Sequence, residues 1–151
     1  MERDGHSHAQ QLADGLEVYQ VHESTGSSIE SVQMRDAKTG TTLWCYKAST
    51  DVGRGLIANI DPDYYPYVAM ASTGTYDKNG NSLGLDMGKF GVNFAIWWDG
   101  DLYREGLDRT YINKWNYTTK GIDRLLTGSD VHANNSTKYT PSLSGDIIGD
   151  W

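Results

Sequence analysis

Two pairs of aspartates have the spacing of a cation site, one in the sequence DPD at 61–63 and one in DGD at 99–101. Calcium binds about six to eight oxygen ligands in flexible geometry and accepts carboxylates, amides and backbone carbonyls. The alternative at each position is an ordinary Asp-Pro or Asp-Gly turn whose carboxylates are solvated. We predict calcium as cofactor, bound by two groups of ligands: Asn59, Asp61 and Asp63 in the first, Asp99 and Asp101 in the second.

Arg54 stands between two glycines, Gly53 and Gly55. Glycine permits close approach of the backbone to a ligand, and a guanidinium can bind a carboxylate through two parallel hydrogen bonds. The alternative is a solvated arginine in a turn. The run NNSTK at 134–138 offers amides, hydroxyls and one ammonium, which suits a ligand rich in hydroxyl groups.

Trp97 and Trp98 are adjacent in an apolar run, so on a strand they point to opposite faces, and at most one can lie along a groove. Aromatic faces stack on sugar rings, and we take Trp98 as the candidate for that contact. The alternative is that both tryptophans pack inside the protein.

Apolar runs of strand length recur along the chain, separated by turn sequences such as DAKTG and KNGN. They predict an all-β meander of short antiparallel strands at 16–21, 29–34, 42–47, 55–60, 67–71 and 93–98. A short helix is considered around 121–126. The polar stretch 127–144 is expected to be a long loop or a ligand-contacting surface, and residues 1–14 are expected to form a frayed N-terminal segment.

Composition excludes several classes of partner. The 151 residues carry 13 Lys and Arg against 20 Asp and Glu, for a formal net charge of -7, and no cluster of cations that could bind nucleic acid. Cys45 is the single cysteine, so no disulfide within the chain is expected. The sequence contains neither an apolar run long enough for a membrane span nor a signal peptide.

Several segments together carry a resemblance. The sequence GLEVYQVHE is followed by GRGLIANIDPDYYP, NFAIWWDGDLYREGLD, INKWN, LLTG, NNSTK and LSGDIIGDW. In order and spacing they resemble the family 11 polysaccharide lyases, the rhamnogalacturonan lyases, over residues 15–151. The resemblance implies an eight-bladed β-propeller with calcium sites, of which this chain would form about two to three blades. It also implies cleavage of the pectic polysaccharide rhamnogalacturonan I by β-elimination between rhamnose and galacturonate, and a secreted or cell-surface location.

The resemblance assigns roles to individual residues. Arg54 matches the family arginine near the substrate, and Asn135, Thr137 and Lys138 match an Asn-Gly-Thr-Lys loop that contacts it. We take Lys138 as the candidate base, with Arg54 as the clamp on the uronate carboxylate or as an alternative base. Ser136 replaces the usual glycine of the loop, and the loop should therefore approach the sugar less closely.

Two departures limit what the resemblance implies. Pro66, Tyr67 and Val68 replace a Gly-x-Glu sequence, which removes an expected calcium carboxylate beside the 61–63 pair. The chain is also too short to close an eight-bladed ring, so open sheet edges would favour self-association or pairing with missing blades. Two other functions therefore remain open, a non-catalytic calcium-dependent module that binds pectin and an integrin-like calcium propeller that binds protein.

Overall fold

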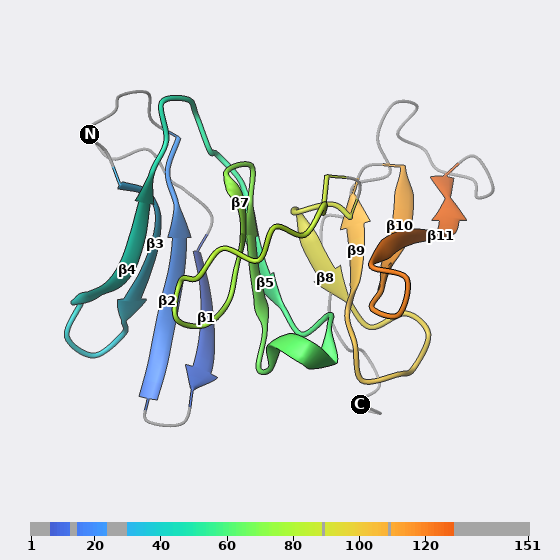
Figure 1. The fold of residues 1–151 in the computed structure, drawn as a ribbon, viewed down its shortest axis with the longest axis horizontal. Coiled ribbons are helices and arrows are strands. Elements are labelled where there is room, and N and C mark those ends of the chain that lie inside the picture. Colours follow the sequence, from blue (N-terminus) through green and yellow to red (C-terminus); the bar gives the residue numbers. More distant parts are fainter. Residues whose placement is uncertain (1–6, 13–14, 24–29, 89, 109, 129–151) are drawn as a thin grey trace.

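The computed structural model describes residues 7–12, 15–23, 30–88, 90–108 and 110–128. These residues form three antiparallel sheets that lie side by side in chain order (Figure 1). The first sheet has the order β1-β2-β3-β4, the second β5-β6-β7 and the third β11-β10-β9-β8. No helix among the described residues is long and apolar enough to cross a membrane.

Each sheet is built from strands that follow one another in the sequence. The first comprises β1 (Ser7–Leu12), β2 (Gly15–Val21), β3 (Glu30–Asp36) and β4 (Thr42–Lys47). The second comprises β5 (Gly55–Ala58), β6 (Val68–Ala71) and β7 (Gly74–Tyr76), with the short 3-10 helix η1 (Pro62–Tyr64) between β5 and β6. The third comprises β8 (Phe94–Ile96), β9 (Glu105–Asp108), β10 (Tyr111–Asn116) and β11 (Gly121–Thr127).

The middle sheet is apolar on both faces because it packs against both of its neighbours. In β5, Ile57 belongs to the cluster shared with the first sheet, whereas Leu56 and Ala58 belong to the cluster shared with the third. Side chains alternate between the faces of a strand, so a strand covered on both sides reads as a continuous apolar run. This explains the sequence GLIA of β5, in which all four residues are buried.

Turn chemistry and aromatic side chains join the first sheet to the second. Gly80, in the predicted Asn-Gly turn, has a φ of 83°, and its carbonyl accepts a hydrogen bond of 2.5 Å from the Tyr46 hydroxyl. The Trp44 indole N–H donates to the Lys78 carbonyl at 3.0 Å, and the Tyr46 ring stacks on that of Tyr76.

The all-β prediction is confirmed, and each of the six predicted strands overlaps an observed one. Two sequence predictions differ from the structure. The segment considered as a helix is strand β11, which hydrogen-bonds along β10. Residues 7–12, placed in a frayed segment, form strand β1 and pair with β2, whose backbone satisfies their hydrogen bonds. The described residues form three small antiparallel sheets, and the sequence predicted two to three propeller blades, too few to close a ring.

Candidate functional site

A cavity of about 770 Å³ opens where the three sheets meet at one edge. It is lined by the segment before β5, the β6–β7 turn, residues 85–88, 91 and 92, the ends of β9 and β10, and Glu23, which follows β2. Among the described residues that line it, Arg54 is the single cation, and four carboxylates accompany it: Glu23, Asp51, Asp86 and Asp108.

The Gly-Arg-Gly sequence places Arg54 at this cavity through two different constraints. Gly53 adopts a φ of 39°, where a side chain is strained, and an added Cβ would lie 3.2 Å from an Asp51 carboxylate oxygen. Gly55 begins β5, and a Cβ there would lie 2.6 Å from a Val21 methyl group. Gly55 therefore serves the packing between sheets, while Arg54 itself is exposed.

The predicted metal ligands lie at the opposite end of β5 from Arg54. Asn59 follows this strand, and its backbone carbonyl accepts a hydrogen bond from the Arg104 N–H at 2.8 Å. Its side-chain amide donates to the Leu102 carbonyl at 3.3 Å. Asn59 thus anchors the loop between β8 and β9, which carries Trp98, and the structure does not bring Trp98 together with Arg54.

Asp61 is fully buried, and both of its carboxylate oxygens are hydrogen-bonded. Oδ2 accepts from the Trp115 indole N–H at 2.7 Å and from the Lys120 ammonium at 2.9 Å. Oδ1 accepts from the Asp63 backbone N–H at 3.0 Å. The same ammonium lies 2.7 Å from Asp63, so a lysine contacts both carboxylates of the pair predicted to bind calcium.

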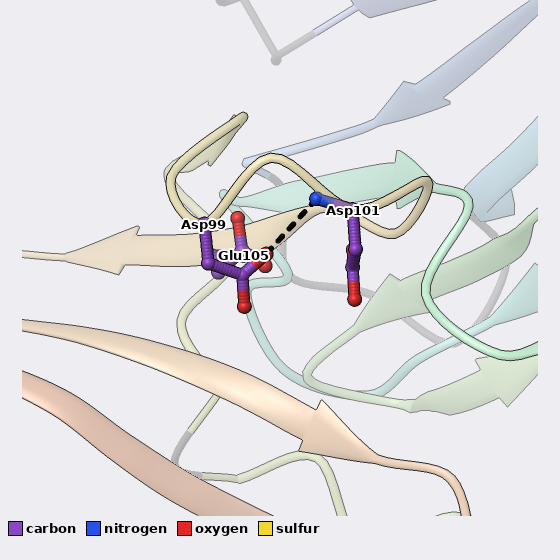
Figure 2. Close-up of side chains that lie close together, drawn as sticks. All are labelled: Asp99, Asp101 and Glu105. Carbon is purple, nitrogen blue, oxygen red and sulfur yellow. Dashed lines mark hydrogen bonds between the residues drawn. The ribbon is translucent and has the colours of Figure 1, made fainter.

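Asp99 and Asp101, on the β8–β9 loop, converge with a third carboxylate, Glu105, the first residue of β9 (Figure 2). One ligand oxygen from each lies within 4.8 Å of the other two, a spacing that could hold a metal ion. Lys114, on β10, points its ammonium at all three: it contacts Asp99, lies 2.6 Å from Asp101 and lies 3.0 Å from Glu105. We call these four residues the Lys114 cluster, and Asp61, Asp63 and Lys120 the Lys120 cluster.

Burial and hydrogen bonds have opposite effects on the pKa of each of these groups. Burial raises the pKa of Glu105, although hydrogen bonds from Lys114 and the Trp98 N–H partly offset it. Burial also acts to raise the pKa of Asp61, but hydrogen bonds from Lys120, Trp115 and the Asp63 N–H outweigh it and lower the value. The pKa of Lys114 is raised, because its three carboxylates outweigh burial.

Trp98 is half-exposed, and its backbone N–H donates to Glu105 at 2.8 Å. The Arg104 guanidinium lies over the ring of Trp97, 4.3 Å from its centroid. The predicted substrate loop, Asn135, Ser136, Thr137 and Lys138, lies outside the described residues, so its position relative to Arg54 stays a prediction.

Sequence reasoning missed Glu105 and the two lysines. Glu105 is four residues beyond Asp101 and begins β9, directly after the loop that carries the two aspartates. The lysines gave no comparable signal, since Lys120 is 57 residues from Asp63 and meets it only through the fold. The contact between Lys114 and Glu105 follows from the register of β9 and β10. Asn113 pairs with Gly106 in this antiparallel pair, so Lys114, which follows Asn113, lies beside Glu105, which precedes Gly106.

Comparison with known proteins gives a consistent result. The model of "Rhamnogalacturonan lyase family 11, C-terminal domain" matches residues 4–151. The rhamnogalacturonan endolyase YesW of Bacillus subtilis is 45% identical over 137 residues, which cover 91% of this chain and 22% of that protein. The rhamnogalacturonan exolyase YesX of the same organism is 37% identical, over 97% of this chain and 28% of that protein.

Solved structures agree with this assignment. The rhamnogalacturonan lyase PL11 of Bacillus licheniformis superimposes with a TM-score of 0.80 at 44% identity, over 97% of this chain and 25% of that one. The crystal structure of YesW gives a TM-score of 0.78 at 42% identity. The chain spans about a quarter of the length of these relatives. The chain belongs to rhamnogalacturonan lyase family 11, and its residues 4–151 match the model of the family's C-terminal domain.

Proposed function

We propose that this chain contributes part of the substrate cleft of a rhamnogalacturonan lyase and that Arg54 binds the uronate carboxylate there. The observation that carries the proposal is the position of Arg54, the single cation among the described residues lining a cavity of about 770 Å³. The family assignment supplies the substrate class, the pectic polysaccharide rhamnogalacturonan I. The relatives YesW and YesX are named an endolyase and an exolyase, so either mode of cleavage is compatible with the family.

The proposed reaction is a β-elimination. A base removes the proton at C5 of galacturonate, the electron pair forms the C4–C5 double bond, and the bond from C4 to the glycosidic oxygen breaks. The oxygen leaves on rhamnose and takes up a proton to become a hydroxyl group. The proton at C5 becomes acidic enough only when the charge of the adjacent carboxylate is offset, and a guanidinium does this with two hydrogen bonds. Arg54 takes this role in the proposal, and Lys138 remains the proposed base, with Asn135, Ser136 and Thr137 contacting the sugar.

Calcium, the predicted cofactor, does not fit either acidic cluster while its lysine is in place. An ammonium already lies among the carboxylates of each. A cation at that position would have to displace it. No step of the proposed reaction therefore uses a metal held by Asp61 and Asp63 or by Asp99 and Asp101. Both clusters also lie at the other end of β5 from Arg54.

The eight-bladed propeller remains part of the proposal for the whole assembly. Three sheets packed face to face in chain order are what consecutive blades would look like. A polymeric pectic substrate is met outside the cell, so we also propose a secreted or cell-surface location.

A second function, carbohydrate binding without catalysis, is proposed for the isolated chain, which spans about a quarter of the length of its relatives. β-Elimination needs base, carboxylate clamp and sugar positioning together, and a misplacement of about 1 Å can cost ~100-fold in rate. We therefore expect the isolated chain to bind rhamnogalacturonan oligosaccharides without turnover at a rate typical of an enzyme.

Titration calorimetry tests whether the chain binds rhamnogalacturonan I. The ligands are oligosaccharides of this polysaccharide that carry no unsaturated end. Arg54→Gln should weaken binding by about 10- to 100-fold, because a hydrogen-bonded charge pair is lost. Lys78→Gln removes an exposed cation that does not line the cavity and serves as the control. Equal affinity of the wild type and Arg54→Gln would reject the clamp, and release of unsaturated uronate by the isolated chain would show that it is catalytically sufficient.

A further inference from the structure

The Lys114 cluster has the hydrogen-bond pattern of a filled cation site. Each of its three carboxylates turns one oxygen toward the Lys114 ammonium: Asp99 Oδ2, Asp101 Oδ2 and Glu105 Oε1. An ammonium has three N–H donors, so the three acceptors match its full capacity.

The second oxygen of each carboxylate accepts a backbone N–H of the same loop. Asp99 Oδ1 accepts from the N–H of Asp101 at 3.3 Å (dashed in Figure 2), and Asp101 Oδ1 accepts from that of Tyr103 at 2.7 Å. Glu105 Oε2 accepts from that of Trp98 at 2.8 Å. All six carboxylate oxygens are thus hydrogen-bonded, and the loop wraps around a positive charge that belongs to β10.

The Lys120 cluster repeats this arrangement on the second sheet. The Lys120 ammonium lies between Asp61 and Asp63, reaching them from the β10–β11 turn. The Tyr64 ring lies 5.6 Å below the ammonium. Two acidic loops at the same end of neighbouring sheets are therefore each closed by a lysine from the β10–β11 hairpin.

We propose that Lys114 and Lys120 are tethered cations that do the structural work of a bound metal, so that neither loop needs calcium. In this proposal removal of Lys114 converts its cluster into a calcium site. This inference is independent of the proposed lyase function, because neither cluster lines the cavity at Arg54.

Geometry and charge both support the conversion. One oxygen from each of the three carboxylates already lies within the spacing of one ion's ligands, and calcium accepts such oxygens together with water. Without the lysine, three carboxylates, one of them fully buried at Glu105, would repel one another with no cation between them. A metal ion is then the group that restores the loop.

The proposal is tested by the midpoint of thermal unfolding of the full 151-residue chain, measured once in EDTA and once in millimolar calcium chloride. Lys114→Met keeps the length of the side chain and removes its charge. We expect its midpoint to fall below that of the wild type in EDTA and to rise by about 5–10 °C in saturating calcium, by mass action on the folded state. The wild type and the exposed-site control Lys78→Met should show no such rise.

Terbium reports the ion's position, because nearby tryptophan sensitises its luminescence. Lys114→Met should bind terbium and release it to calcium, whereas the wild type should not. The double variant Lys114→Met/Glu105→Gln removes the buried charge together with the lysine, so it should fold in EDTA and lose the calcium response. This variant keeps the test valid if Lys114→Met fails to fold without metal.

Two outcomes would overturn the proposal. One is a calcium-dependent midpoint in the wild type as large as that in Lys114→Met, which would mean that calcium binds despite the lysine. The other is a Lys114→Met protein that neither responds to calcium nor binds terbium, which would leave the lysine as an ordinary ion-pair partner.

Discussion

The buried carboxylate of Asp61 depends on a small number of donors for its charge. Its side chain is fully buried, and an ionised carboxylate in such a position is costly unless it is paired and hydrogen-bonded. Trp115, itself buried, supplies one of these bonds from β10 and thereby joins the second sheet to the third. The interaction is thus both an electrostatic contact and a packing contact.

Trp115→Phe should lower the free energy of unfolding by about 1.5–3 kcal/mol, because one hydrogen bond to a charged group is lost. Urea denaturation followed by circular dichroism measures the change. In an Asp61→Asn background, Trp115→Phe should lower the free energy of unfolding by a smaller amount, because a hydrogen bond to a neutral amide contributes less than one to a carboxylate. Equal costs in the two backgrounds would mean that the indole acts only through its volume.

The lowered pKa of Asp61 makes a pH dependence at acid pH. A carboxyl group whose pKa is lower in the folded than in the unfolded state stabilises the fold above its ordinary value of 3.8, and this stability is lost as the pH falls through the folded value. Urea denaturation at a series of pH values measures this dependence. The difference in unfolding midpoint between the wild type and Asp61→Asn should be constant near neutral pH and should become smaller below pH 3.8. An advantage that persists at the most acidic pH would contradict this assignment.

Individual residues were predictable where the local sequence was sufficient. The position of Arg54 follows from its neighbours Gly53 and Gly55, and both acidic pairs follow from their spacing. Lys114 and Lys120 were not predictable, because each meets its partners through strand register and sheet packing rather than through proximity in sequence. The sequence predicted a cation at each acidic pair, and the structure places a lysine ammonium against both pairs.

At the scale of elements, apolar strands were visible and polar ones were not. β5 and β6 are buried on both faces and read as continuous apolar runs. β9 has the sequence EGLD, in which a buried glutamate is tolerated because Lys114 on the next strand contacts it. β11 exposes the middle of its sequence, so it lacks the alternation that indicates a strand. β11 is a strand because its backbone hydrogen-bonds to β10.

Gly106 on β9 offers a test of how closely the elements pack. A Cβ there would lie 2.2 Å from the Phe90 carbonyl oxygen, so one of the two segments must shift. Gly106→Ala should cost about 1–3 kcal/mol through overpacking. Gly121→Ala, on β11 of the same sheet, is the matched control, because its Cβ would meet nothing closer than 3.5 Å. Equal stability of the two variants in urea would show that the Phe90 segment is not held against β9.

At the scale of the molecule, the described residues of the first and third sheets each share a core cluster with the middle sheet, which packs on both of its faces. Leu16 on β2 and Leu43 on β4 are each about half-exposed, on the face of the first sheet opposite its core with the second. We predict that the chain self-associates through this face and that Leu16→Lys with Leu43→Lys shifts it toward monomer. Sedimentation velocity over a range of concentrations measures this, and an unchanged distribution of species would reject the interface.

The most direct test of the proposed function replaces the matching segment of the B. subtilis endolyase YesW with this chain. The two are 45% identical over 137 residues, so the replacement should preserve the contacts with the rest of that enzyme. Formation of unsaturated uronate from rhamnogalacturonan I, followed by ultraviolet absorbance, measures activity. We predict an active chimera that loses at least about 100-fold in rate on Arg54→Gln, as expected for a group that stabilises charge in the transition state. A folded Arg54→Gln chimera as active as its parent would contradict the account.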